Sequence, residues 1–211
     1  MGMTPSKALP FLLIAAVSAL SLTPTVAGAK QLTVTTTSGK SFAQRVSPES
    51  RIPRFAEIRP GLTRGGEPDE SGLSYLRDRG YKTIVSFLAD PDESTFVVEH
   101  GMKYVHIPIR SGPFSCPAPS DDQVRQFLSV ATDTTLYPMF IHCHAGKDRT
   151  GAMTAIYRME ACGWTNGEAV EEMKSFGFAG RYKKLFNYVQ SYKPAAAATA
   201  ANVTEGTTAT P

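Results

Sequence analysis

The middle of the chain alternates between short apolar runs and longer stretches in which apolar residues recur with helical spacing. Runs rich in β-branched and aromatic residues at 83–88, 104–109 and 139–142 predict three buried strands. The stretches between and after them place apolar residues at i, i+3, i+4 and i+7, which predicts helices with one buried face. Apolar strands that alternate with helices are typical of an α/β fold, so we expect a central, mainly parallel sheet flanked by helices.

Capping residues mark where several of these helices begin. Asp69 is placed to cap a helix that ends at Gly80. Ser120 and Thr165 each start a capping box, because a Gln or a Glu stands three positions later and can bond back to the cap. A last amphipathic helix is predicted over 182–189. The helix predictions therefore rest on local chemistry as well as on periodicity.

The first 29 residues have a different pattern from the rest of the chain. Lys7 precedes the mostly apolar run 8–22, and small residues follow with A-x-A spacing at 27–29. We expect a signal peptide at 1–29 that is cleaved after Ala29, so that the protein is exported to the periplasm or secreted. The alternative is an uncleaved anchor, but the run is shorter than the ~20 residues that span a bilayer. After cleavage we expect no stable membrane span.

Two further segments lack the pattern of a packed core. Residues 30–50 are polar and poorly periodic, which predicts a linker or a loose arm. Residues 194–211 are rich in Ala and Thr, and we expect a disordered tail because so few large apolar side chains cannot offset the entropy of ordering. One domain remains, at 51–193.

The composition narrows the class of protein. The 211 residues are 42% hydrophobic and 19% charged, which suits one globular core. With 22 basic and 19 acidic residues the formal net charge is +3, which is too small to indicate a nucleic-acid partner. Three cysteines exclude a scaffold built from disulfides, and their odd number leaves at least one thiol for chemistry.

One segment, 142–151 (HCHAGKDRTG), combines the features of an anion site. It follows a predicted buried strand and precedes a helical stretch of small and apolar residues. Backbone N–H groups at such a helix start converge on one point and bind an anion such as phosphate. Gly146 allows the turn that this cradle needs, and Arg149 can donate two parallel hydrogen bonds to phosphate oxygens.

Cys143 stands at the start of this predicted phosphate site. The helix dipole, Lys147 and Arg149 all favour its thiolate form. A thiolate beside a bound phosphate can attack phosphorus in line with the leaving oxygen, so that hydrolysis proceeds through a phosphocysteine intermediate. The hydroxyl of Thr150 is placed to help the sulfur leave. The alternative is that Cys143 is simply a small buried residue after a strand. It does not account for the spacing that places Arg149 and Thr150 six and seven positions after the cysteine.

The pattern Cys-x5-Arg-Thr-Gly with a preceding His resembles the signature loop of the protein tyrosine phosphatase superfamily, in particular dual-specificity phosphatases of the bacterial type. Residues 64–68 resemble the loop at the entrance of the family's site, and residues 163–173 resemble the segment behind its signature helix. The resemblance implies a phosphoric monoester hydrolase that uses no metal or other cofactor. It also implies Cys143 as nucleophile and the following loop residues as phosphate-binding groups: His144, Ala145, Gly146, Lys147, Asp148 and Arg149.

The general acid that protonates the leaving oxygen is not evident from the sequence. The family typically supplies an Asp from a loop before the cysteine, but residues 110–114 (RSGPF) contain no acid. Asp121 and Asp122 come next, at a predicted helix start where carboxylates also suit the helix dipole. Asp148 lies within the signature loop and resembles the aspartate of bacterial loops that end in GKDRT. These three carboxyl groups are the candidates.

The charge of the loop bears on the substrate. Lys147 and His144 favour a substrate with several negative charges, such as a phosphoinositide or an inositol phosphate. The Gly-Lys-Asp-Arg form also resembles loops that act on phosphoproteins, so phosphotyrosine, phosphoserine and phosphothreonine proteins stay candidates. Arg181 and the neighbouring lysines could extend a basic rim or form a solvated helix face.

Other functions are consistent with parts of the pattern. A phosphatase-like module could bind a phosphorylated ligand with little turnover, which the missing acid would explain. A rhodanese-like sulfur transferase also uses a cysteine loop, but the GKDRTG run fits it poorly. Cys116 could pair with Cys143 and block the nucleophile, or pair with Cys162, or both could be free thiols.

Overall fold

The structure, a computed structural model, describes residues 35–46, 48–178 and 180–195. The predicted signal peptide at 1–29 lies outside these residues. So does all of the predicted tail except positions 194 and 195.

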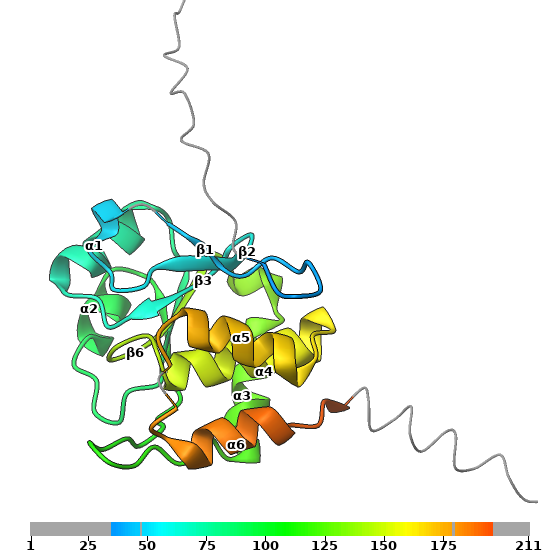
Figure 1. Ribbon diagram of the computed structural model, residues 1–211. Coiled ribbons are helices and arrows are strands. Elements are labelled where there is room, and N and C mark those ends of the chain that lie inside the picture. The colour runs from blue at the N-terminus through cyan, green and yellow to red at the C-terminus, as the bar shows by residue number, and fades with distance from the viewer. Residues whose placement is uncertain (1–34, 47, 179, 196–211) are drawn as a thin grey trace, which may run out of the picture. The chain divides into compact units, whose positions relative to one another are not determined.

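Six strands form one mixed sheet in the described part of the chain (Figure 1). The strands are β1 (Gln44–Arg45), β2 (Ala56–Arg59), β3 (Leu62–Gly66), β4 (Thr83–Ser86), β5 (Lys103–His106) and β6 (Met139–Cys143). Their order across the sheet is β1-β2-β3-β6-β4-β5. The neighbours from β3 to β5 are parallel, whereas β1, β2 and β3 pair antiparallel. β6 therefore lies at the centre of the parallel part, and α/β folds bind ligands beyond the carboxyl ends of such strands.

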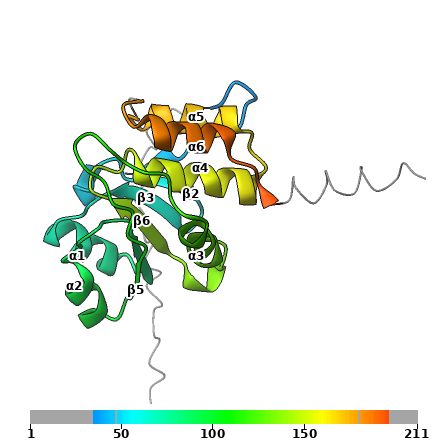
Figure 2. The ribbon, with the colours of Figure 1, turned by 90° about the horizontal axis from the view of Figure 1, so that it is seen from below.

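Helices cover both faces of this sheet. Figure 2 shows α4, α5 and α6 on one face and α1 and α2 on the other. The bounds of the helices are α1 (Glu70–Asp78), α2 (Ser94–Glu99), α3 (Asp121–Ala131), α4 (Arg149–Cys162), α5 (Asn166–Ser175) and α6 (Lys183–Ser191), with 3-10 turns at Pro48–Ser50 and Thr134–Leu136. None of the helices described combines the length and the apolar character that crossing a membrane requires.

Alternate residues of the central strands contribute to two apolar clusters. Ile84 of β4 and Phe140 of β6 belong to the cluster that contacts α1 and α2. Their neighbours Val85 and Ile141 belong to the larger cluster, which includes residues of α3, α4, α5 and α6. Successive side chains of a strand point to opposite faces, so a sheet covered on both sides needs continuous apolar strands. This is the origin of the apolar runs in the sequence.

The predicted α/β fold is confirmed, together with its three apolar strands. Both capping boxes are formed, at Ser120 and Thr165, and the Asp69 side chain accepts a hydrogen bond from the N–H of Gly72. The sequence pattern does not predict the β2–β3 hairpin or α2. β3 is buried along its whole length although it contains Arg64 and two glycines, which no hydrophobic pattern would indicate.

Residues 35–46 are packed on the domain, which corrects the expectation of a linker or loose arm at 30–50. Phe42 and Ala43 are buried in the larger apolar cluster, and β1 pairs with β2. The N–H of Ala43 also donates to a carboxylate oxygen of Glu172 in α5, at 2.6 Å. The sequence pattern does not predict this packing because the few apolar residues of the segment show no periodicity.

Candidate active site

The loop between β6 and α4 has the strand–loop–helix context that the sequence predicts. Cys143 is the last residue of β6, and Arg149 is the first residue of α4. Cys143 is only 2% exposed. The first backbone N–H groups of a helix have no acceptor within the helix, so the start of α4 directs donors toward the loop, which suits an anion. We call residues 143–149 the phosphate loop.

The phosphate loop rests directly on the backbone of β3. Gly146 has φ +67°, in the left-handed region, and a Cβ at this position would lie 2.5 Å from the carbonyl carbon of Gly65 and 2.6 Å from the nitrogen of Gly66. Thr150 adds a hydrogen bond from its hydroxyl to the carbonyl of Gly65, at 3.4 Å. The glycines on both sides allow two backbone segments to touch, and this contact fixes the height of the loop above the sheet.

Two arginines that the sequence reasoning did not identify hold carbonyl groups of the phosphate loop. Arg64 donates from Nη2 to the carbonyl of Gly146 at 2.7 Å, and Arg54 donates from Nη1 to that of Ala145 at 3.1 Å. Arg64 is fully buried, its guanidinium lies 4.1 Å from the centre of the Phe176 ring, and burial lowers its pKa to about 10. Arg64 was noted only as part of the resemblance at 64–68.

Arg149 is fixed by the ends of two neighbouring strands. Its Nη1 donates to the carbonyls of Phe87 and Ile109, at 3.1 and 3.2 Å, and these residues follow β4 and β5. A guanidinium held in this way loses little further freedom on binding, so it is preorganised to receive phosphate oxygens.

Cys143 and Arg149 share one pocket of about 390 Å³, which we call the catalytic pocket. Three of its walls come from the phosphate loop, from the loop after β5 and from the segment before α6. The lining residues are Ser111, Gly112, Pro113, Cys143, His144, Ala145, Asp148, Arg149, Arg181 and Tyr182. The Cys143 thiol, a fixed cation and the helix start are therefore available to a single ligand.

The remaining predicted loop residues lie beside the catalytic pocket but do not line it. Gly146 is buried against β3, and Thr150 is fully buried below the loop. The methylene groups of Lys147 lie close to Gly177, away from the lining set. The catalytic pocket receives its second cation from Arg181, one of the residues for which the sequence left two interpretations open.

The three candidate acids are in different places. Asp121 and Asp122 are exposed at the start of α3, where Asp122 pairs with Arg125, and neither lines the catalytic pocket. Asp148 lines it and is half-buried. Burial raises the pKa of Asp148, although the cations around it act in the opposite direction. Geometry thus favours Asp148 as the proton donor.

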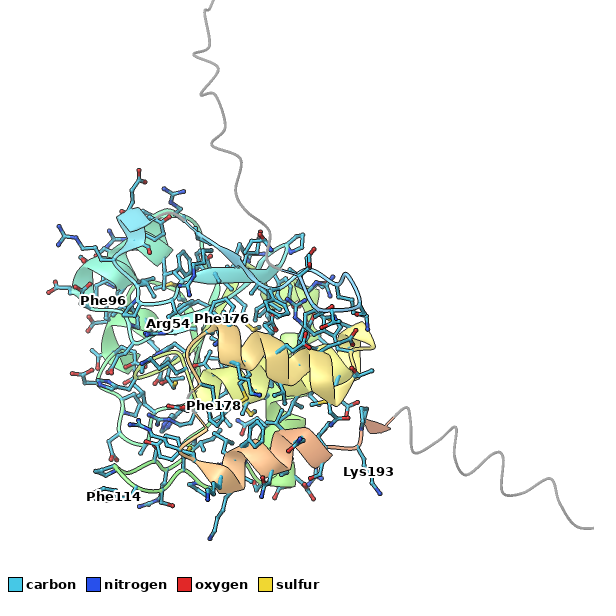
Figure 3. All side chains as sticks on the ribbon, viewed as in Figure 1. Arg54, Phe96, Phe114, Phe176, Phe178 and Lys193 are labelled. Carbon is cyan, nitrogen blue, oxygen red and sulfur yellow. The ribbon has the colours of Figure 1, made fainter. Side chains whose placement is uncertain are left out.

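The loop after β5 closes one side of the catalytic pocket. The hydroxyl of Tyr182 donates to the carbonyl of Gly112 at 3.1 Å, which ties this loop to the segment before α6. Phe114, two residues further on, is 97% exposed and projects from the molecule in Figure 3. An aromatic ring therefore stands next to the pocket wall without packing into the core.

His142, the histidine that precedes the nucleophile in the signature pattern, points below the phosphate loop, and its ring nitrogens make no hydrogen bond to the backbone of the described residues. Its ring is fully buried, stacks on Phe140, and has Nε2 3.3 Å from a carboxylate oxygen of Glu93. Burial alone would raise the pKa of Glu93, but the nearby imidazole of His142 outweighs it and lowers that pKa to about 2. A buried carboxylate therefore faces the His142 imidazole beneath the loop. Glu93 comes after β4 and is therefore far from His142 in the sequence.

The three cysteines are free thiols. Cys116 is buried, and burial raises its pKa. The disulfides considered from the sequence are not formed in this structure.

Comparison with known proteins agrees with this geometry. Residues 42–188 match the family model PTP-NADK, described as a DSP-PTPase phosphatase fused to NAD+ kinase. The chain is 29% identical over 138 residues to the dual specificity protein phosphatase TpbA of Pseudomonas aeruginosa, covering 65% of this chain and 60% of TpbA. It is 27% identical over 143 residues to the inositol diphosphatase DSP3 of Arabidopsis thaliana, covering 65% and 69%.

A solved structure extends the likeness to three dimensions. The crystal structure of a cysteine-to-serine variant of P. aeruginosa TpbA in complex with pTyr matches with a TM-score of 0.58 and 25% identity, over 75% of this chain and 94% of that one. The chain spans only 60% of the full length of TpbA. Because the family model covers well over half of the chain, the protein belongs to the PTP-NADK family of DSP-PTPase phosphatases, within the superfamily that its signature loop resembles.

Proposed function

We propose that this protein is a cysteine-dependent phosphatase that hydrolyses phosphate monoesters. The observation that carries the proposal is the shared catalytic pocket: the Cys143 thiol and the Arg149 guanidinium line one cavity at the start of α4. A pocket with a fixed guanidinium and unpaired backbone donors binds a tetrahedral dianion and stabilises its equatorial oxygens as charge shifts during transfer.

The reaction consists of two displacements at phosphorus. In the first, the Cys143 thiolate forms an S–P bond while the O–P bond to the leaving group breaks, and the carboxyl of Asp148 donates a proton to the departing oxygen. In the second, water attacks phosphorus, its proton passes to the Asp148 carboxylate, and the S–P bond breaks to return the thiolate and inorganic phosphate. The raised pKa of Asp148 favours the protonated form that the first step needs.

Substrate identity is part of the proposal. TpbA is named a dual specificity protein phosphatase and DSP3 an inositol diphosphatase, so relatives of similar identity point to phosphoproteins and to inositol phosphates. The catalytic pocket contains His144 and Arg181 besides Arg149, which is compatible with either class. Phosphotyrosine, phosphoserine and phosphothreonine proteins and phosphoinositides are therefore the substrates to test.

We also propose that the protein is exported to the periplasm or secreted. The pattern of residues 1–29 supports this, with a basic start, an apolar run and small residues before the expected cut after Ala29. Expression of the full chain followed by N-terminal sequencing of the exported protein tests it. Export with an N-terminus at Lys30 is the expected result. A chain that stays in the cytoplasm would contradict export, and an exported chain that retains Lys7 would contradict the cleavage.

Hydrolysis of p-nitrophenyl phosphate tests the enzymatic proposal. We expect Cys143→Ser to abolish turnover and Arg149→Lys to lower kcat/KM by about 10²–10³-fold, because lysine cannot reproduce the paired donors. Cys162→Ser is the matched control, since Cys162 lies at the far end of α4 and does not line the catalytic pocket. Turnover retained in Cys143→Ser would refute the phosphocysteine route.

A phosphate-binding module is the second candidate function. It is favoured by one observation, that the loop after β5 contributes Ser111, Gly112 and Pro113 to the pocket and no carboxyl group. Tight binding of phosphotyrosine by the wild-type chain, with no phosphate released and no phosphocysteine trapped, would select this function over hydrolysis.

A further inference from the structure

A second pocket opens beside the catalytic pocket. It has a volume of about 700 Å³, shares His144 and Ala145 with the catalytic pocket, and is bordered by α1 and α2. We call it the acidic pocket. Its lining consists of Pro53, Arg54, Glu67, Pro68, Asp69, Glu70, Leu73, Asp92, Glu93, Phe96, His144 and Ala145. A ligand whose phosphate occupies the catalytic pocket would therefore have this second cavity next to it.

Carboxylates dominate the lining of the acidic pocket. Five of its residues are Asp or Glu, whereas its basic side chains are Arg54 and His144. One carboxylate oxygen from each of Glu67, Asp92 and Glu93 lies within 4.8 Å of the others. His144 Nδ1 lies 2.6 Å from a carboxylate oxygen of Glu67, and His142 faces Glu93. Three carboxylates at this separation still repel one another, and a further cation among them would relieve the repulsion.

The burial of Glu93, one of these three carboxylates, gives a second sign of a cationic ligand. Its side chain is 3% exposed. Its Oε1 accepts a hydrogen bond from the Tyr104 hydroxyl at 3.0 Å and faces His142. Its Oε2 has no hydrogen-bond partner among the residues that the structure describes. A buried carboxylate oxygen without a donor is costly, so a positively charged donor entering the pocket would satisfy it.

The other lining residues indicate what kind of cation fits. Leu73 and Phe96 border the pocket with apolar surface. One face of the Phe96 ring stacks on His100, with 4.0 Å between the ring centres, and Figure 3 shows Phe96 on the same side of the molecule as Arg54. Arginine and lysine bury their methylene stems against such surface and place their charge near carboxylates or over a ring. A bare divalent ion would be bound by oxygen ligands alone and would leave most of this volume unfilled.

We propose that the acidic pocket binds an arginine or lysine side chain of a phosphorylated protein substrate whose phosphate occupies the catalytic pocket. The proposal rests on the proposed phosphatase function and specifies its substrate class. The same carboxylates would repel an inositol phosphate or a phosphoinositide headgroup, which carries further negative charge. The protein therefore selects basic phosphopeptides over polyanionic small molecules.

Kinetics on a peptide series test the proposal. The probe is a phosphotyrosine peptide of alanine and glycine in which a single arginine is moved from four positions before to four positions after the phosphotyrosine. At one or two positions we expect arginine to raise kcat/KM by about 5-fold over alanine, the scale of one or two partly exposed ion pairs. p-Nitrophenyl phosphate, which carries no basic side chain, reports the catalytic step separately.

Two exposed carboxylates of the pocket serve as the variant. In the double variant Glu70→Gln/Asp92→Asn, kcat/KM for the arginine peptides should come within about 2-fold of that for the alanine peptide. Turnover of p-nitrophenyl phosphate should stay at the wild-type value. Glu99→Gln is the matched control, because Glu99 is an exposed acid of α2 outside the pocket, and it should leave both rates unchanged.

Three results would overturn the proposal. Equal rates for arginine and alanine peptides at every position, with p-nitrophenyl phosphate still hydrolysed, would reject the acidic pocket while leaving the phosphatase function intact. Faster hydrolysis of a phosphoinositide or an inositol phosphate than of every peptide would reject the substrate class. Calcium or magnesium binding that the double variant abolishes, with no arginine preference in wild type, would assign the pocket to a metal ion.

Discussion

Replacing Gly146 with alanine tests how the phosphate loop is positioned. Two separate features of the structure oppose a side chain there. The backbone has φ +67°, which L-residues other than glycine adopt at a cost, and the added Cβ would lie 2.5–2.6 Å from backbone atoms of Gly65 and Gly66. Backbone atoms of a central strand cannot rotate away, so the loop itself has to move.

The two features give a magnitude. The left-handed conformation costs a non-glycine residue roughly 1–2 kcal/mol. Inserting a methyl group into a closely packed contact costs about 1–3 kcal/mol. Together they predict a loss of about 2–5 kcal/mol in the free energy of unfolding, which corresponds to a fall in Tm of roughly 4–20 °C for a chain of this size. A loop displaced by about 1 Å would also lose on the order of 10²-fold in kcat/KM.

Gly163→Ala separates the two contributions. Gly163 ends α4 with φ +64°, nearly the same conformation as Gly146, but a Cβ there would have no atom within 4 Å. It should therefore show the conformational cost alone and keep full activity. Urea denaturation and hydrolysis of p-nitrophenyl phosphate measure both variants. If Gly146→Ala is no less stable than Gly163→Ala and equally active, the contact with β3 does not position the loop.

Three further predictions concern other parts of the molecule. Asp148→Asn should lower kcat on alkyl phosphates by about 10²–10⁴-fold and change p-nitrophenyl phosphate turnover far less. In wild type, hydrolysis of alkyl phosphates should slow as pH rises through the raised pKa of Asp148, because the acid then loses its proton. A pH profile that the substitution leaves unchanged would exclude Asp148 as the proton donor. Glu172→Gln should lower the free energy of unfolding by about 3–5 kcal/mol in urea denaturation, because the buried Arg158 guanidinium loses its charged partner at 2.8 Å. A loss below about 1 kcal/mol would show that water already solvates the pair. Phe42→Ala should cost about 3–5 kcal/mol if the arm at 35–46 is part of the core, whereas a loose arm would give a value near zero.

The sequence by itself determined the features that depend on residues close together in the chain. The capping boxes at Ser120 and Thr165 join groups three positions apart, so they could be predicted and are formed. The same holds for the strand–loop–helix that carries the phosphate loop, because a strand, a cysteine, a glycine and an arginine within ten residues predict it. That this loop binds an anion stays a prediction. The apolar strands that identify the α/β fold are also local signals, because burial on both faces requires continuous apolar residues.

Only the tertiary structure decided which groups distant in sequence complete the site. The sequence pattern assigns Arg64 no contact, yet Arg64 is fully buried and donates a hydrogen bond to the carbonyl of Gly146, because β3 lies directly beneath the phosphate loop. The three candidate acids could be distinguished only in the structure, where Asp148 lines the catalytic pocket and Asp121 and Asp122 do not. A local pattern records periodicity and capping, but the burial of a charge depends on partners that the fold brings together from elsewhere in the chain, and that information is absent from any short window of sequence.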